Sequence, residues 1–376
     1  MGTVLFISNI TYKITSFSSS SIYATHKMGM RFIHAANWSK ASAEQIELFE
    51  KENDITICNV PISRSPFSLS NIESFKKLCR IVKDNNVEYI HCNTPVGGLL
   101  GRLVGKKCKV KKIIYQAHGF HFYKGSPKKN WLIYYPIERW LAHYTDILIT
   151  INSEDYELSK TKFKLHNGGK IYYIPGVGID LTQYELPDNV RKIKRTELGL
   201  KETDIALISA GELNENKNNQ IIIQALSELK NNNIHYIICG VGPKYSELKK
   251  IVSDNNLDNF VHFLGYRNDI KELYKACDIF VMPSFREGLS RSMMEAMAAG
   301  LPCIASRIRG NVDLLDDNKG GFLCDPTDVN QFVSAIKKCD VNTRHKFGEY
   351  NLNAIKQYDI HVVEEEIRRI YEEVFQ

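Results

Sequence analysis

The chain has 376 residues, of which 43% are hydrophobic and 24% charged, with a formal net charge of +6 at pH 7. This length predicts two domains of roughly 150–200 residues each, and the composition is ordinary for a soluble globular protein. No apolar run is long enough for a membrane-spanning helix, no basic lead or cleavage site marks a signal peptide, and nine cysteines without a CxxC pair predict reduced thiols in a cytoplasmic protein.

Short β-branched and aromatic runs alternate with longer amphipathic stretches along the chain. Strands are predicted at residues 4–8, 55–60, 87–92, 112–117, 146–151 and 171–174, and then at 205–210, 234–239, 260–265, 278–283, 302–306 and 321–324. These runs are almost continuously apolar, which is typical of parallel strands covered by helices on both faces. The sequence therefore predicts an α/β protein with two doubly wound, Rossmann-like domains that face each other across a cleft.

A segment rich in Gly, Pro and Asp separates the two sets of strands. It reads IPGVGIDLTQYELPDN and is followed by the charged run RKIKRTELGLKETD. We expect a linker near residues 175–190, with domains at 1–176 and 177–358. The last helix, near 359–376, has no strand after it; it could pack onto either domain, and the N-terminal domain is the expected one.

Residues 101–150 carry ten Lys and Arg but only two acids, Glu138 and Asp146. Such a segment favours an anionic partner, which could be a phosphate-bearing ligand, an anionic membrane surface or nucleic acid, whereas the alternative is a solvated face. No zinc pattern, RNP-like strand or basic heptad is present, so nucleic acid is not an expected partner.

The segment after the strand at 278–283 carries the strongest functional pattern. Its sequence, FREGLSRSMMEAMAAGLP, predicts a helix that begins near Ser290 and ends at a Gly-Pro stop. The unpaired N–H groups and dipole of the first helical turn suit a diphosphate. Glu287 precedes this helix and Glu295 lies about two turns inside it, so one carboxylate can face a sugar hydroxyl while the other reaches a ribose. A surface helix with solvated acids is the alternative, which the strand–turn–helix context disfavours.

The stretch from Asp278 to Ser306 resembles the donor-site motif of the retaining glycosyltransferases of family 4, which have the GT-B fold, with Glu287 and Glu295 as its E-x7-E pair. The resemblance covers nearly the whole chain, including residues 174–180, 211–218 and 239–250, and residues 117–141 resemble bacterial capsule and exopolysaccharide transferases in particular. It implies a hexosyl- or N-acetylhexosaminyl-transferase that moves a sugar from a nucleotide-diphosphate donor, expected to be a UDP-sugar, to a lipid-linked or other saccharide acceptor with retention.

The resemblance also implies a set of donor contacts in the second domain. Glu295 would bind the ribose, Glu287 a hydroxyl of the transferred sugar, and Lys217 the charge that builds on the leaving diphosphate. Tyr266 and Arg267 would frame the base. The remaining implied contacts are Gly211, Glu212, Gly240, Gly242, Gly288, Leu289, Ser290 and Arg291.

Two departures from the family pattern concern the phosphates and the acceptor. The family usually has an arginine directly after the glycine at 211, where this chain has Glu212; Arg291 and Arg286 are candidates to replace it. The loop at residues 8–21 lacks the Gly-Gly turn of many relatives, so the identity of the acceptor does not carry over.

In the first domain, His118 directly follows the strand at 112–117 and is expected to point into the cleft. By resemblance it contacts the donor sugar, either as a base or as a positioning group; the alternative is a core histidine. Asn9, His121 and Lys124 are expected near the acceptor.

The next helical stretch combines aromatic with basic residues, namely Trp131, Tyr134, Tyr135 and Trp140 beside Lys128, Lys129 and Arg139. This combination suits a surface that contacts anionic lipid, but packing of the aromatic side chains in the core is the stronger alternative. With lipid contact, the acceptor would be a polyprenyl-diphosphate-linked saccharide, and the protein would be peripheral on the inner face of the cell membrane.

No Asp-x-Asp metal motif occurs, so neither a divalent ion nor another cofactor is expected, and catalysis should rest on positioning and electrostatics. Two alternatives stay open. A nucleotide-sugar epimerase or a phosphorylase on the same fold would release free epimer or sugar phosphate without an acceptor. A catalytically weak accessory subunit that binds a nucleotide sugar is the other, and Glu212 is the residue that favours it.

Overall fold

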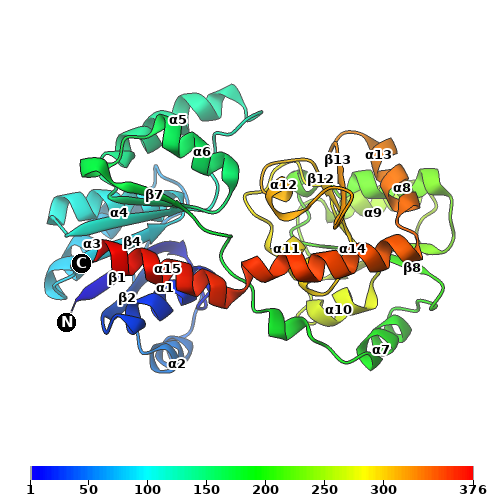
Figure 1. The fold of residues 1–376 in the computed structure, drawn as a ribbon, viewed down its shortest axis with the longest axis horizontal. Helices are drawn as coiled ribbons and strands as arrows, with labels where there is room; N and C mark the ends of the chain where they lie inside the picture. Colours follow the sequence, from blue (N-terminus) through cyan, green and yellow to red (C-terminus); the bar gives the residue numbers. More distant parts are fainter. Residues whose placement is uncertain (1, 376) are drawn as a thin grey trace. The chain divides into compact units, whose positions relative to one another are not determined.

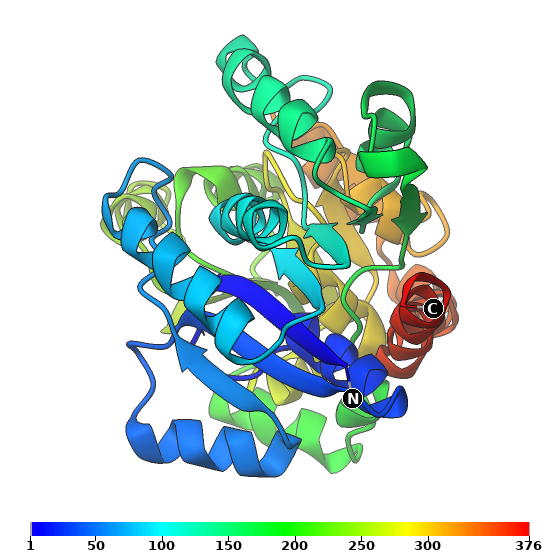
Figure 2. The same cartoon turned by 90° about the vertical axis from the view of Figure 1, so that its left-hand side faces the viewer.

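The computed structural model describes residues 2–375, which form two compact α/β units (Figures 1 and 2). The first unit comprises residues 2–178 and 360–375, and the second comprises Ile179–Asp359. Within the described residues, no helix combines the length and the apolar character needed to cross a bilayer.

The first unit is built on a seven-stranded parallel sheet with the order β3-β2-β1-β4-β5-β6-β7. Its strands are β1 (Thr3–Ile10), β2 (Arg31–Asn37), β3 (Thr56–Asn59), β4 (Tyr89–Asn93), β5 (Lys112–Ala117), β6 (Ile147–Thr150) and β7 (Lys170–Tyr173). Its helices before the linker are α1 (Ser16–Lys27), α2 (Ala43–Asn53), α3 (Ser70–Asp84), α4 (Pro95–Cys108), α5 (Lys128–Ala142), α6 (Ser153–Lys162) and the 3-10 turn η1 (His166–Gly168). Helices α1 and α2 cover one face of the sheet, and α3 and α4 cover the other (Figures 1 and 2).

Side chains of β1 alternate between these two faces. Leu5 and Ile7 pack into the core beneath α4, whereas Phe6 packs with Ile22 of α1 on the opposite face. Both faces of the sheet are therefore buried from solvent at this strand, which explains why the strand is apolar at consecutive positions. This arrangement confirms the predicted doubly wound architecture for the first unit.

The C-terminal helix α15 (Ile360–Val374) belongs to the first unit and lies against α1 (Figure 1). Three contacts hold it there: Tyr23 donates a hydrogen bond to Glu365 at 2.7 Å, the Tyr371 hydroxyl lies 2.7 Å from Nδ1 of His91, and Phe375 stacks on Tyr89 at 3.9 Å. The two chain crossings at Gly178 and Ile360 therefore bring the end of the chain back to the unit in which it began.

The second unit has a six-stranded parallel sheet with the order β10-β9-β8-β11-β12-β13. Its strands are β8 (Ile205–Ala210), β9 (Ile234–Cys239), β10 (Val261–Gly265), β11 (Ile279–Met282), β12 (Cys303–Ser306) and β13 (Gly321–Cys324). Its helices are η2 (Leu181–Tyr184), α7 (Asn189–Glu197), η3 (Glu215–Lys217), α8 (Gln220–Leu229), α9 (Tyr245–Asp254), α10 (Ile270–Ala276), α11 (Arg291–Ala298), α12 (Asn311–Leu314), α13 (Val329–Lys338), α14 (Val341–Ala354) and η4 (Ile355–Tyr358). Ala206 and Ile208 of β8 face the core beneath α10 and α11, and Leu207 faces the opposite core beneath α8 and α13.

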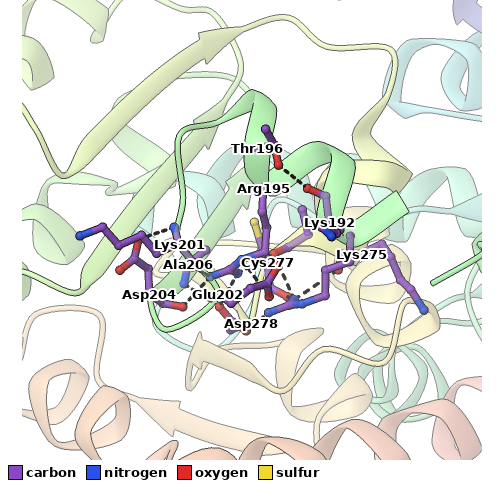
Figure 3. A network of polar contacts seen from close by, with 12 residues as sticks. Lys192, Arg195, Thr196, Lys201, Glu202, Asp204, Ala206, Lys275, Cys277 and Asp278 are labelled. Carbon is purple, nitrogen blue, oxygen red and sulfur yellow. Dashed lines mark hydrogen bonds and ion pairs between the residues drawn. The ribbon is translucent and has the colours of Figure 1, made fainter. Parts of the chain in front are cut away.

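Helix α7, which carries the charged run after the Gly/Pro segment, is anchored to the second unit by a buried arginine (Figure 3). Arg195 is 1% exposed and contacts Asp278 at 3.2 Å, while Arg191 contacts the other carboxylate oxygen of Asp278 at 2.8 Å. The same carboxylate accepts the backbone N–H of Ala206 at 2.8 Å. The charged run is therefore an integral part of the second unit.

The sequence analysis did not predict β2, whose residues read RFIHAAN. The strand is buried from Phe32 to Ala36, but a histidine and two alanines replace the β-branched residues that mark the other strands. His34 is accommodated because its Nε2 lies 3.0 Å from the hydroxyl of Ser8 on the neighbouring strand.

Candidate active site

The turn between β11 and α11 has the local structure that the sequence predicts. Ser290 precedes α11 as its N-cap, and its hydroxyl accepts the N–H of Met293 at 3.4 Å. Gly288 and Leu289 form the turn, and a Cβ atom on Gly310 would lie 2.1 Å from the carbonyl oxygen of Gly288. Gly310 also has a φ of +81°, so a glycine at 310 is required for the turn to pack this closely.

Lys217 and Glu287 form an ion pair. Nζ of Lys217 lies 2.7 Å from Oε1 of Glu287, and the two side chains are 22% and 15% exposed. The backbone N–H of Lys217 is held by the side-chain oxygen of Asn214 at 3.1 Å, and its side chain lies beside Gly211. Two residues that are distant in sequence thus present a cation and a carboxylate at the same edge of the sheet.

Three side chains surround the carboxylate of Glu295. Nε of Arg291 contacts its Oε1 at 3.0 Å, the hydroxyl of Tyr274 lies 3.5 Å from its Oε2, and the hydroxyl of Tyr184 also hydrogen-bonds to it. Burial and the nearby carboxylate raise the pKa of both tyrosines, so their hydroxyls stay protonated and act as donors. The sequence analysis missed both tyrosines, because η2 and α10 meet α11 only in the folded unit.

A cavity of about 530 Å³ opens beside the ends of β8 and β9. This volume lies within the range of small-molecule sites. Its lining residues are Ala210, Gly211, Glu212, Cys239, Gly240, Val241, Gly242, Tyr266, Arg267 and Ile270. A Cβ atom on Gly240 would lie 1.8 Å from the carbonyl oxygen of Gly211, so the two loops can approach only without a side chain there. Four of the predicted donor contacts, Gly211, Glu212, Gly240 and Gly242, thus line one cavity together with Tyr266 and Arg267.

The guanidinium of Arg267 is committed to neighbouring acids. Its Nε and Nη2 donate to the two oxygens of Asp269 at 2.7 and 2.6 Å, and Nη2 also donates to Glu197 at 2.8 Å. These contacts, with a further one from Lys194, hold the pKa of Asp269 well below its usual range. Arg267 therefore offers the cavity a planar surface more than an unpaired charge.

Glu212 is exposed and accepts a hydrogen bond from the side-chain amide of Asn214 at 3.0 Å. Of the two arginines considered as replacements for the missing cation, Arg291 is engaged with Glu295. Arg286 is exposed, and its backbone oxygen accepts a hydrogen bond from Asn216 at 2.9 Å, which fixes the backbone beside Glu287. No ion pair of the Arg286 side chain is found among residues 2–375, so its guanidinium is the less engaged of the two.

In the first unit, His118 stacks on Phe17 with ring centroids 4.0 Å apart and nearly parallel planes. The residue is half-buried, and its Nε2 is buried without a hydrogen-bond partner in the described part of the chain. Burial lowers the pKa of His118 to about 3, so the imidazole is neutral at pH 7.

The three residues expected near the acceptor have different surroundings. The side-chain oxygen of Asn9 accepts the Thr94 hydroxyl at 2.9 Å and the Gly97 N–H at 2.7 Å, so Asn9 caps the start of α4. His121 stacks on Tyr134 at 4.6 Å. Lys124 is exposed, and its backbone N–H donates to Glu154 at 2.6 Å.

The aromatic residues of α5 do not share one face. Trp131, Tyr134 and Tyr135 pack against the core of the first unit, as the alternative in the sequence analysis has it, whereas Trp140 is 48% exposed. The basic segment is also divided, because Arg102 is 1% exposed and pairs with Glu138 at 2.7 Å over the ring of Tyr115.

Family models and known proteins show what this chain is similar to. The family model for glycosyl transferases group 1 matches residues 190–353, and that for glycosyl transferase 4-like proteins matches residues 33–152. A Bacillus subtilis (strain 168) protein named as a glycosyltransferase, EpsD, is 34% identical over 340 residues, which cover 89% of this chain and 86% of that protein.

An Escherichia coli UDP-Gal:alpha-D-GlcNAc-diphosphoundecaprenol alpha-1,3-galactosyltransferase is 31% identical over 273 residues, covering 71% of this chain and 70% of that enzyme. The crystal structure of Anabaena HepE in complex with UDP and glucose has the same fold, with a TM-score of 0.80 at 19% identity over 99% of this chain and 100% of that one.

Proposed function

Because this chain belongs to the group 1 glycosyltransferases of the GT-B fold, we propose that it transfers a hexosyl or N-acetylhexosaminyl group from a UDP-sugar to a polyprenyl-diphosphate-linked saccharide. The observation that carries the donor part is the open cavity of the second unit, whose lining residue Gly211 lies beside the side chain of Lys217, the partner of Glu287. Support for the acceptor comes from the Escherichia coli relative, which acts on a sugar linked to diphosphoundecaprenol.

The proposed donor roles follow from the chemistry of each group. The cavity receives the nucleoside, with Tyr266 and Arg267 beside the base and Glu295 accepting hydrogen bonds from the ribose hydroxyls. The N-terminus of α11 and Lys217 receive the diphosphate, because exposed helical N–H groups and an ammonium both stabilise negative charge. Arg286 supplies the cation that Glu212 does not.

In the proposed reaction, the bond between the anomeric carbon and the β-phosphate oxygen of the donor breaks, and UDP leaves with the bonding electron pair. The acceptor hydroxyl oxygen bonds to the anomeric carbon on the same face, and its proton goes to the leaving phosphate oxygen. Lys217 neutralises the charge that develops on that oxygen. Glu287 orients the sugar. The neutral His118 can donate or accept a hydrogen bond without adding a positive charge.

The lipid-linked acceptor has a consequence for location. A polyprenyl-diphosphate carrier resides in a bilayer, so the enzyme would act as a peripheral protein at the inner membrane surface, in the synthesis of an exopolysaccharide or capsule. The Escherichia coli relative, whose acceptor is a sugar linked to diphosphoundecaprenol, supports this placement.

A calorimetric panel of UDP- and GDP-sugars tests the donor assignment. At least one UDP-sugar should bind the wild-type protein with a measurable heat and raise its unfolding temperature. The same ligand should bind Glu295→Ala much more weakly, while the exposed-surface control Lys250→Ala binds normally. Absence of binding by every nucleotide sugar would reject the proposal and favour the accessory subunit.

A further inference from the structure

Helix α5 has an outer face on which apolar side chains are exposed. The face consists of Leu132, Ile133, Pro136, Ile137 and Trp140, which we call the α5 face; Leu132 is 77% exposed. Their spacing of one and four residues places them together along one side of a helix. The opposite side of α5 is fixed, because Trp131, Tyr134 and Tyr135 pack into the core.

The exposed charges of helix α5 itself have one sign. The single acid of this helix, Glu138, is turned inward to the buried Arg102, where its two oxygens accept hydrogen bonds at 2.7 and 3.2 Å. Lys128 and Lys129 are exposed at the start of the helix, and Arg139 is exposed near its end. An exposed apolar stripe flanked by cations, with no exposed acid on the helix, complements an anionic lipid surface and disfavours a basic or strongly polar partner.

Helix α2 provides the contrast within the same unit. Its residue Leu48 is also half-exposed, but the exposed acids Glu44, Glu47 and Glu52 lie on the same short helix. An anionic bilayer would repel this surface. Exposure of an apolar residue alone therefore does not distinguish the α5 face; its combination with cations does.

We propose that the α5 face docks the enzyme on a bilayer containing anionic phospholipid, with Leu132, Ile133, Ile137 and Trp140 entering the interfacial region and Lys128, Lys129 and Arg139 contacting lipid phosphates. The biological role of this contact rests on the proposed function, because docking would bring the enzyme to its lipid-linked acceptor. The contact itself depends only on the first unit and needs no nucleotide sugar.

Vesicle co-sedimentation with the full chain tests the proposal. Vesicles of phosphatidylcholine with phosphatidylglycerol should bind the wild-type protein, and vesicles of phosphatidylcholine alone should bind it far less. Lys128→Ala and Lys129→Ala should each weaken binding to the anionic vesicles about fivefold, and the double variant Leu132→Glu/Ile137→Glu should weaken it at least about tenfold. Leu48→Glu is the matched control and should bind as the wild type does.

Trp140 supplies a local readout. Trp38 is buried and Trp131 is packed on the core, so a blue shift of emission on adding anionic vesicles should come from Trp140 and disappear in Trp140→Phe. Failure of the wild type to bind anionic vesicles would overturn the proposal. Binding that survives Leu132→Glu/Ile137→Glu would also overturn it. Light scattering gives a third such outcome: the wild type self-associates, the double variant does not, and neither binds vesicles.

Two further measurements separate this proposal from the function. Circular dichroism should show that the α5 variants are folded. Donor binding by calorimetry should be unchanged in them, because the donor residues lie in the second unit. Loss of vesicle binding by the α5 variants with intact donor binding thus supports the docking face. Absence of donor binding by the wild type would count against the proposed function only.

Discussion

The two units share a doubly wound parallel sheet but stabilise the loops after their strands in different ways. In the second unit, charged side chains form pairs: Lys217 with Glu287 across two loops, and Arg291 with Glu295 within helix α11. In the first unit, His118 is held by stacking on Phe17. An ion pair fixes the position of a carboxylate before any ligand binds, whereas stacked rings define mainly a shape. The comparison indicates that charge pairs order the loops of the second unit, whereas ring packing orders the His118 loop of the first unit.

The largest expected effects come from the two buried arginines, one in each unit. Arg102→Ala and Arg195→Ala should each lower the free energy of unfolding of their own unit by about 3–5 kcal/mol. The first leaves the largely buried Glu138 carboxylate without its cation. The second removes the donor to three backbone carbonyl oxygens, those of Ala276, Lys201 and Asp204, although Asp278 keeps Arg191. All three tryptophans lie in the first unit. In urea, Arg102→Ala should therefore shift the tryptophan-fluorescence transition.

For Arg195→Ala, we expect a shift of the transition seen by circular dichroism with little change in fluorescence. The exposed Arg369→Ala should change neither transition. Equal shifts of the fluorescence transition in the Arg102 and Arg195 variants would show that the two units unfold as one, contrary to the separate cores described here.

The next largest effect concerns the charge on the leaving group. Lys217→Ala should lower kcat about 10²–10³-fold, because it removes the cation nearest the proposed diphosphate position and leaves Glu287 without its partner. Steady-state kinetics with a UDP-sugar and a lipid-linked acceptor would measure this change in kcat. Lys250→Ala serves as the control with an exposed lysine of the same unit. A kcat within twofold of the wild type for Lys217→Ala would remove Lys217 from the mechanism.

Donor affinity should depend strongly on the Glu295 carboxylate, which is proposed to bind the ribose, and less strongly on the tyrosines beside it. Glu295→Ala should raise the Kd for UDP about 10–150-fold, since hydrogen bonds to a charged group are lost. Tyr274→Phe and Tyr184→Phe remove only donors that orient this carboxylate, so calorimetry should show increases of a few-fold. An effect of Tyr274→Phe as large as that of Glu295→Ala would mean that the tyrosine contacts the ligand itself.

The smallest effect is a pH dependence of stability that arises in the first unit. Burial lowers the pKa of His34 and His91 to about 3, against about 6.5 in an unfolded chain. As the pH falls below 6.5, the unfolded state binds protons that the folded state does not, so stability decreases toward acid. Between pH 7 and pH 5.5 the loss should be about 1 kcal/mol for each of these histidines.

Urea unfolding followed by tryptophan fluorescence at both pH values measures this loss. His91→Gln should lose less stability on acidification than the wild type does, because it removes one of the histidines of this unit, His34, His91 and His118, whose pKa burial lowers. A stability that increases on acidification would contradict the burial of neutral imidazoles in this unit.

The sequence predicted the architecture well where local pattern determines it. The apolar strands, the helix that starts at Ser290 and the order of the donor loops all follow from residue types within short windows. The strand β2 did not, because His34 and two alanines are buried there without the β-branched pattern. Residue pairing across loops was also beyond the sequence: nothing local indicates that Lys217 meets Glu287, or that Tyr184 and Tyr274 reach Glu295.

The orientation of α5 illustrates the same limit. Its sequence contains aromatic, aliphatic and basic residues at nearly every position, so periodicity alone left core packing and lipid contact as alternatives. The fold shows that Trp131, Tyr134 and Tyr135 pack inward, whereas Leu132, Ile133 and Trp140 are exposed. Nothing in the sequence alone indicates that Asn9 caps helix α4, because this contact depends on the pairing of β1 with β4.

The most direct test of the proposed function is a transfer assay with radiolabelled UDP-galactose, UDP-glucose and their N-acetylhexosamine counterparts against an undecaprenyl-diphosphate-linked N-acetylglucosamine. Labelled sugar should enter the organic-solvent fraction for at least one donor, and nuclear magnetic resonance of the product should show an α-linkage, since the donor sugar is α-linked to UDP. A β-linked product would contradict retention. Release of free epimer or sugar phosphate, with no labelled lipid from any donor, would contradict the transferase assignment itself.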